Sequence, residues 1–140
     1  MSQGFSETFE ITAGDFAAAG EASSKIKGLL KRIGIDPALV RRVTIAAYEA
    51  EMNIIIHSLG GTMTLDVTPE AVSLNCSDIG PGIPDIGQAM QEGFSTAPSS
   101  VRMMGFGAGM GLPNMKRNSD TFDIRSGSGG TTLIMSFGMR

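Results

Sequence analysis

The first third of the chain carries a polar and apolar pattern that predicts one strand and one helix. Residues 7–12 alternate between polar and apolar positions, as a half-buried strand does. Beyond them, apolar residues recur at the spacing of one helical face, at Ile26, Leu29, Leu30 and Ile33. The pattern therefore predicts an amphipathic helix from about residue 15 to Gly34.

A second helix is predicted to begin at the pair Asp36-Pro37. Aspartate is one of the residue types that cap helix N-termini, and proline suits the first helical position because an N–H there would have no partner. The helix is expected to run to about Ser58, because Gly60 and Gly61 follow it.

The rest of the chain predicts an antiparallel sheet and two shorter helices. Turn residues separate two pairs of strands: residues 62–67 with 71–78, and residues 122–125 with 131–137. Helices are expected just after Pro84 and over residues 112–119, with Pro113 in the first turn of the latter. This order predicts an α+β fold, a two-layer α/β sandwich whose mixed, mainly antiparallel sheet is covered on one face by helices.

Composition narrows the functional classes. With 140 residues, 41% of them hydrophobic and 18% charged, the chain is expected to form one domain over residues 1–140. The net charge of −3 and the absence of a basic run argue against nucleic-acid binding. Cys76 lies in an alternating run and is interpreted as a small strand residue. No signal peptide or membrane-spanning stretch is apparent, so a cytoplasmic protein without membrane contact is expected.

Two glycine clusters, residues 78–82 and 105–111, are the strongest chemical signal. The first opens with the carboxylate of Asp78, which suits recognition of a base, and the second precedes a predicted helix, where bare backbone N–H groups bind phosphates. A dinucleotide fingerprint would follow a first strand, and a Walker loop requires a Gly-Lys pair that the chain lacks. The clusters therefore predict a nucleotide site of another type.

The segment over residues 93–107 is long for a connection in so small a domain. Loops of this length are usually functional lids or disordered segments. Since its flanks are the two glycine clusters, we favour the interpretation that it closes over a bound triphosphate.

A polar stripe on the second predicted helix carries further chemistry. At helical spacing, Glu49, Asn53 and His57 share one face, whereas Glu51 points in about the opposite direction. A carboxylate one turn from an amide supplies a base or an orienting group together with an oxygen ligand for Mg²⁺. The alternatives are an ordinary solvated face and, for His57, a structural hydrogen-bonding role or a phosphoacceptor role.

Four motifs resemble the N box and the three glycine boxes of the GHKL ATPase superfamily, which includes gyrase and the histidine kinases. In chain order they are Glu49-x-x-x-Asn53, Asp78-x-Gly80-x-Gly82, Gly107-x-Gly109-x-Gly111 and Gly130-Thr131-Thr132. The compact length resembles that of the anti-sigma factor serine/threonine kinases of bacterial partner-switching systems. The stretches 80–85, 93–96 and 111–117 are especially similar to the switch kinases of the stressosome branch.

This resemblance implies a Bergerat-type ATP site. Glu49 would polarise the attacking hydroxyl, Asn53 would hold Mg²⁺, Asp78 would bind the adenine amino group, and Thr131 would fix the adenine through water. The implied nucleotide-binding set is Asn53, Asp78, Gly80, Gly82, Ser95, Thr96, Arg102, Gly107, Gly109, Gly111, Leu112 and Thr131. Related sporulation-type kinases have an arginine just before the second glycine box, and here Arg102 or Lys116 would have to take its place.

The expected function is an ATP- and Mg²⁺-dependent protein serine/threonine kinase that phosphorylates a STAS-type anti-sigma-antagonist-like partner. A sigma factor or a phosphatase is an alternative partner, and a homodimer is compatible with the resemblance. Two other functions stay open: a non-catalytic, ATP-gated binding module and the detached catalytic domain of a histidine kinase.

Overall fold

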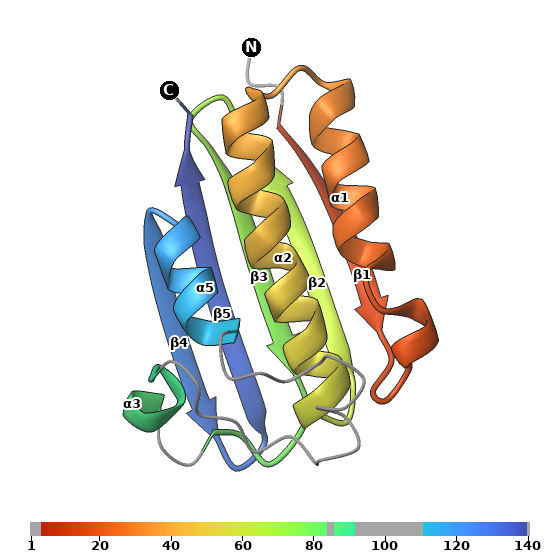
Figure 1. Cartoon of the computed structure of the whole chain (residues 1–140), viewed down its shortest axis with the longest axis vertical. Helices are drawn as coiled ribbons and strands as arrows, with labels where there is room; N and C mark the ends of the chain where they lie inside the picture. The colour runs from red at the N-terminus through yellow and green to blue at the C-terminus, as the bar shows by residue number, and fades with distance from the viewer. Residues whose placement is uncertain (1–3, 84–85, 92–110, 140) are drawn as a thin grey trace.

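The computed structural model describes residues 4–83, 86–91 and 111–139. Within them, helices and strands form two layers (Figure 1). The elements in chain order are β1 (Phe5–Ile11), the short 3-10 helix η1 (Phe16–Ala18), α1 (Glu21–Arg32), α2 (Pro37–His57), β2 (Gly61–Val67), β3 (Ala71–Asp78), α3 (Ile86–Ala89), α5 (Gly111–Asn118), β4 (Thr121–Gly127) and β5 (Gly130–Gly138).

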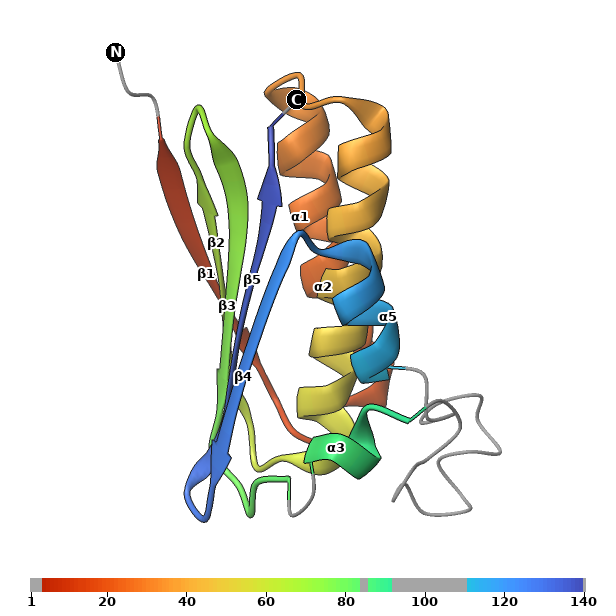
Figure 2. The same ribbon diagram turned by 90° about the vertical axis from the view of Figure 1, so that its left-hand side faces the viewer.

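The described strands form one five-stranded sheet in the order β1-β2-β3-β5-β4. All four neighbouring pairs are antiparallel, so the parallel pairing that a mixed sheet would require is not found among the described strands. Figure 2 shows α1, α2 and α5 on one face of this sheet, and no described helix covers the opposite face. The predicted two-layer α+β fold is therefore confirmed.

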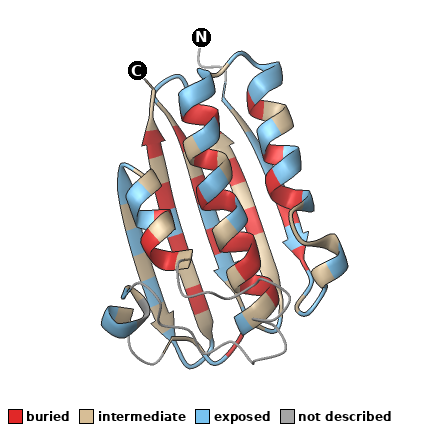
Figure 3. Cartoon of the chain, viewed as in Figure 1, coloured by how far each residue is buried: buried red, intermediate tan, exposed pale blue. Residues whose placement is uncertain are grey.

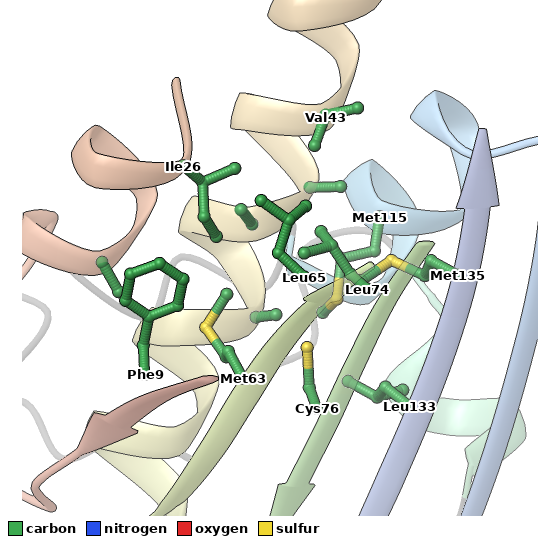
Figure 4. Close-up of a cluster of buried hydrophobic side chains, with 14 of the residues drawn as sticks. Phe9, Ile26, Val43, Met63, Leu65, Leu74, Cys76, Met115, Leu133 and Met135 are labelled. Carbon is green, nitrogen blue, oxygen red and sulfur yellow. The ribbon is translucent and has the colours of Figure 1, made fainter. Parts of the chain in front are cut away.

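The strand register aligns apolar side chains in rows beneath the helices. Leu65 pairs with Leu74, and Leu74 pairs in turn with Met135, all three fully buried. Their neighbours along the strands point to the uncovered face, because successive strand residues face opposite sides, and all of them except Ile134 are polar. Figure 3 shows buried residues along α2 and the central strands, and Figure 4 shows Phe9, Met63 and Met115 in the same core.

The N-terminus of α2 follows the sequence prediction. The Asp36 carboxylate accepts hydrogen bonds from the N–H groups of Ala38, at 3.1 Å, and Leu39, at 3.4 Å, and Pro37 occupies the first turn. The predicted strand boundaries agree with the observed ones to within two residues.

The predicted start of the first helix at residue 15 is wrong. Asp15 instead accepts a hydrogen bond from Ala18 N–H and caps η1, and α1 begins only at Glu21. Ile33, which was counted on the buried face, follows the last helical residue and is 49% exposed. The apolar spacing continues past the point where the backbone leaves the helix, so the pattern extended the helix too far at both ends.

Cys76 lies in the core between the sheet and the helices, as its alternating context predicted (Figure 4). Burial raises the pKa of its thiol to about 12, so the thiolate that reacts with electrophiles or metals is absent at neutral pH. None of the helices in the described ranges has the length and apolar character needed to cross a lipid bilayer.

Candidate functional site

The candidate site lies at one end of the molecule, where several elements converge. The C-terminal half of α2, the end of β3 and the turn between β4 and β5 meet there, and the first turn of α5 lies beside α2 (Figure 1). All four places carry motif residues: Glu49 and Asn53 on α2, Asp78 at the end of β3, Thr131 just after the β4–β5 turn, and Gly111 at the start of α5.

The two glutamates of α2 have opposite environments, as the helical spacing predicted. Glu49 and Asn53 are half-buried, whereas Glu51 is 2% exposed and faces α1. The Glu51 carboxylate accepts three backbone N–H groups at the start of α1, from Gly20, Ala22 and Ser23, at 3.1 to 3.2 Å. Glu51 therefore caps α1 from the neighbouring helix, which compensates its buried charge.

Sequence reasoning did not assign this role to Glu51. The signal was nevertheless present, because Glu51 lies on the apolar side of α2 near Ala47 and Ile54, both buried. A carboxylate on an apolar helical face requires donors from another element, since a buried charge without partners is costly.

Glu49 contacts the first turns of α5. The Asn114 side chain donates a hydrogen bond from Nδ2 to Glu49 Oε2 at 3.0 Å. The other carboxylate oxygen, Oε1, lies 3.6 Å from the place that a Cβ on Gly111 would occupy. The carboxylate thus lies at the N-terminal end of α5, where the free N–H groups of a helix attract negative charge.

Asn53 lies one turn beyond Glu49 on the same face of α2. Its side chain is half-buried, and no hydrogen bond from it to another described residue is found, which is compatible with an amide oxygen that binds a ligand. The described part of the chain holds no cluster of three or more histidine, cysteine or acidic residues suited to a metal ion. A magnesium ion held at Asn53 would therefore take most of its ligands from phosphate oxygens and water, which is the coordination that Mg²⁺ prefers.

Asp78 ends β3 and is fixed by the neighbouring strand. Its Oδ1 accepts the backbone N–H of Thr131 at 3.0 Å, and no hydrogen bond to its Oδ2 is found among the described residues. Burial raises the pKa of Asp78, an effect that the hydrogen bond from Thr131 partly offsets. One carboxylate oxygen is therefore held in place while the other can accept a hydrogen bond from a ligand.

The first glycine cluster is packed against the β4–β5 turn. Gly80 N–H donates to the Gly129 carbonyl at 3.1 Å, and Ile83 N–H donates to Ser126 Oγ at 2.6 Å. Gly82 has a φ of +79°, and a Cβ there would overlap the carbonyl oxygen of Gly127. Only glycine fits this position, because both the backbone conformation and the close approach exclude a side chain.

Two hydroxyls extend this packing toward Asp78. Ser126 Oγ lies 2.8 Å from the Oγ1 of Thr131, which is 5% exposed. Ser126 thus connects the turn at Gly82 to Thr131, and Thr131 in turn donates its N–H to Asp78. The sequence did not indicate this role for Ser126. Gly130, with a φ of +149°, contacts the Asp78 carbonyl so closely that a side chain there would collide with it.

The structure thus brings the predicted residues into two groups, Glu49 with Gly111 and Asp78 with Gly80, Gly82 and Thr131. Leu112 is 6% exposed and packs into the core, so a contact with nucleotide would have to come from its backbone. Lys116 is exposed on α5, and His57 is the last residue of α2. The predicted site residues that lie outside the described ranges, together with the proposed lid over residues 93–107, are Ser95, Thr96, Arg102, Gly107 and Gly109.

Comparison with known proteins agrees with this geometry. The family model for the histidine kinase-like ATPase domain matches residues 12–137. The serine/threonine-protein kinase RsbT of Bacillus subtilis is 31% identical over 130 residues, and the alignment covers 90% of each chain.

A similar solved structure is the crystal structure of the RsbU and RsbW domains of Rv1364c from Mycobacterium tuberculosis. It has 18% sequence identity and a TM-score of 0.62, and the match covers 96% of the present chain but only 33% of the other. At this identity the likeness supports the fold alone.

Proposed function

The chain belongs to the histidine kinase-like ATPase domain family, and we propose that it is an ATP- and Mg²⁺-dependent protein serine/threonine kinase. The observation that carries the proposal is the α2 face on which Glu49 and Asn53 lie one turn apart, with Glu49 at the N-terminal end of α5. This face places an ionisable acceptor and an amide oxygen together where a helix terminus favours phosphate.

Glu49 is proposed to accept the proton of the attacking hydroxyl. A general base must reach the proton that it abstracts and must retain acceptor capacity. The Glu49 carboxylate has one described hydrogen bond, from Asn114, and lies on the same helical face as the metal ligand. Asn53 supplies that ligand, and a bound Mg²⁺ neutralises charge on the phosphate groups during transfer.

Asp78 is proposed to recognise the adenine base. Its Oδ1 is held by Thr131, so the carboxylate has a fixed orientation and Oδ2 is left to accept the adenine amino group. Gly80 and Gly82 allow the turn after β3 to pack closely against Ser58 and Gly127, which holds the backbone next to Asp78, and the Thr131 hydroxyl is proposed to reach the base through a water. The donor and acceptor pattern fits adenine, because guanine would present an oxygen to the same carboxylate.

A STAS-type anti-sigma-antagonist-like protein is the proposed substrate, and a bacterial partner-switching system is the proposed setting. The similarity to RsbT, which is named a serine/threonine-protein kinase, extends over nine tenths of both chains and supports a serine or threonine acceptor.

The test is an incubation of the protein with ATP, Mg²⁺ and a purified STAS-domain protein from the same organism. The proposal predicts an acid-stable phosphate on a serine or threonine of the STAS protein. An acid-labile, base-stable phosphate would instead identify a histidine kinase. Tight ATP binding without any transfer to STAS proteins would identify a nucleotide-gated binding module.

A further inference from the structure

The contact between α2 and α5 contains a side chain that the motifs did not point to. Asn114 is the fourth residue of α5 and lies on the side that faces α2. Its side-chain amide donates a hydrogen bond to Glu49 Oε2 at 3.0 Å. We propose that Asn114 is a positioning residue that fixes the Glu49 carboxylate for proton abstraction. This inference rests on the proposed kinase function, in which Glu49 is the base.

The orientation of the Asn114 amide is fixed from both sides. Arg117 donates from Nη1 to Asn114 Oδ1 at 3.0 Å, and the carboxylate of Glu49 accepts from Nδ2. A guanidinium has only donors and a carboxylate has only acceptors, so the reversed amide would face like groups on both sides. The amide therefore presents its N–H to Glu49 in one orientation.

The docking of α5 does not depend on this hydrogen bond. Leu112 and Met115 bury the apolar side of the helix, at 6% and 0% exposure. At the other end of α5, Arg42 of α2 donates from Nε to the Asn118 carbonyl at 2.9 Å and pairs with Asp120 at 2.9 Å. Because apolar packing and Arg42 hold α5 in place, the hydrogen bond from Asn114 is not needed to dock the helix and can instead orient Glu49.

The geometry also explains why a positioning group is needed. Glu49 is half-buried, and among the described residues it is the Asn114 side chain that donates a hydrogen bond to its carboxylate. A glutamate side chain has three rotatable bonds, and displacement of a reacting group by about 1 Å can cost on the order of 100-fold in rate. One donor from a rigid helix removes much of this freedom and leaves Oε1 to accept the proton.

The first arm of the test compares Asn114→Leu and Asn114→Asp with the matched control Asn118→Leu in the full chain. Asn118 lies one turn later and donates to the Asn114 carbonyl, not to Glu49. We expect kcat for transfer to the STAS protein to fall by roughly tenfold or more in both Asn114 variants, with KM for ATP changed less than about twofold. The control should keep near-normal kcat.

The relative kcat values of the two Asn114 variants distinguish a positioning role of the side chain from a packing role. Aspartate preserves the shape of asparagine but places a second carboxylate against Glu49, whereas leucine only removes the donor. Positioning therefore predicts that Asn114→Asp is at least as impaired as Asn114→Leu. An aspartate variant that is clearly more active than the leucine variant would show a packing role and overturn the inference.

The second part of the test detects the contact between Asn114 and Glu49 without measuring kinase activity. It records the ¹⁵N–¹H NMR resonances of the Asn114 side-chain amide. In Glu49→Ala these resonances should move, while those of Asn118 stay in place. Unchanged Asn114 resonances overturn the inference. Absence of transfer by the wild-type protein would reject the proposed kinase activity, and the resonances would then decide by themselves whether Asn114 orients the carboxylate.

Discussion

At the scale of single residues, three carboxylates illustrate how partners decide what an acidic side chain can do. Glu51 accepts three backbone N–H groups, and both of its carboxylate oxygens are used to cap the start of α1. Asp78 accepts one backbone N–H and keeps one oxygen for a ligand, whereas Glu49 is held by a side-chain amide. Of the three, Glu49 has the surroundings that a general base requires.

Substitution of the two α2 glutamates should separate chemistry from stability. Glu49→Gln should lower turnover by roughly 10²–10⁴-fold, as removal of a positioned base does, with ATP still bound. Glu51→Gln loses the charge that caps α1 and turns an amide N–H toward backbone donors, so it should cost about 1–3 kcal/mol of unfolding free energy. Urea unfolding and single-turnover transfer measure the two effects. Equal losses of turnover at equal stability would contradict the assignment.

The proposed contact between Asp78 and the adenine base, together with the raised pKa of this carboxyl, predicts that ATP binding depends on pH. Because burial raises the pKa, protonation on acidification begins at a higher pH than for an ordinary aspartate. The protonated acid is a poorer acceptor for the adenine amino group, so ATP affinity should fall as the pH is lowered and recover as it is raised. Calorimetric titration of wild type and Asp78→Asn at several pH values checks this. Parallel pH curves for the two proteins would show that Asp78 does not contact the base.

At the scale of elements, the glycine turn after β3 acts through its fit against the β4–β5 turn. Gly82 combines a positive φ with contact to the Gly127 carbonyl, and Gly80 donates to Gly129. These contacts join the two turns next to Asp78 and Thr131. The site depends on this backbone contact as much as on its side chains.

Two glycine-to-alanine substitutions should have opposite effects. Gly82→Ala should lower the unfolding free energy by more than about 1 kcal/mol and weaken ATP binding, because the Cβ strains the backbone and collides with the neighbouring turn. Gly28 lies inside α1 with open space around it, so Gly28→Ala should stabilise the protein by up to about 1 kcal/mol. Thermal unfolding of both variants measures the difference. A stable, fully ATP-binding Gly82→Ala would contradict the close fit.

Helix boundaries and site residues with a signal in the neighbouring sequence could be predicted. Those that depend on a residue far away in the sequence could not. Asp36 and Pro37 located the start of α2 because a helix cap lies next to the helix that it caps. The start of α1 was missed because its cap is Glu51, about thirty residues away on another helix. In the same way, helical spacing identified Glu49 and Asn53, whereas Asn114 emerged only from the packing of α5 on α2.

At the scale of the whole molecule, the candidate site lies at one end of a two-layer fold. The helices cover one face of the sheet and the other face is mainly polar, while the candidate residues gather where α2, β3 and the β4–β5 turn converge (Figures 1 and 2). The region combines the half-buried α2 face with the rigid turns around Asp78. A ligand bound at the proposed site would contact both α2 and the end of the sheet, and a ligand that binds only the folded state stabilises the whole chain.

This coupling predicts a metal-dependent stabilisation by ATP. The melting temperature should rise with ATP concentration, and it should rise further when Mg²⁺ is present, because Asn53 then contributes a metal ligand. In Asn53→Ala the additional increase due to Mg²⁺ should disappear, while the fold without ligand stays near wild-type stability. Melting curves with ATP in Mg²⁺ or in EDTA supply the comparison. The same Mg²⁺ increment in both proteins would exclude Asn53 as a ligand.

The most direct test of the central claim is a single-turnover phosphotransfer measurement at saturating ATP and Mg²⁺, with intact-mass detection of the STAS partner. The account predicts one acid-stable phosphoryl group transferred by the wild-type protein, and transfer slowed by roughly 10²–10⁴-fold in Glu49→Gln at equal ATP occupancy. Equal transfer rates for the two proteins would contradict the placement of the reaction at the α2 face. No transfer by wild type with ATP bound would contradict the kinase function itself.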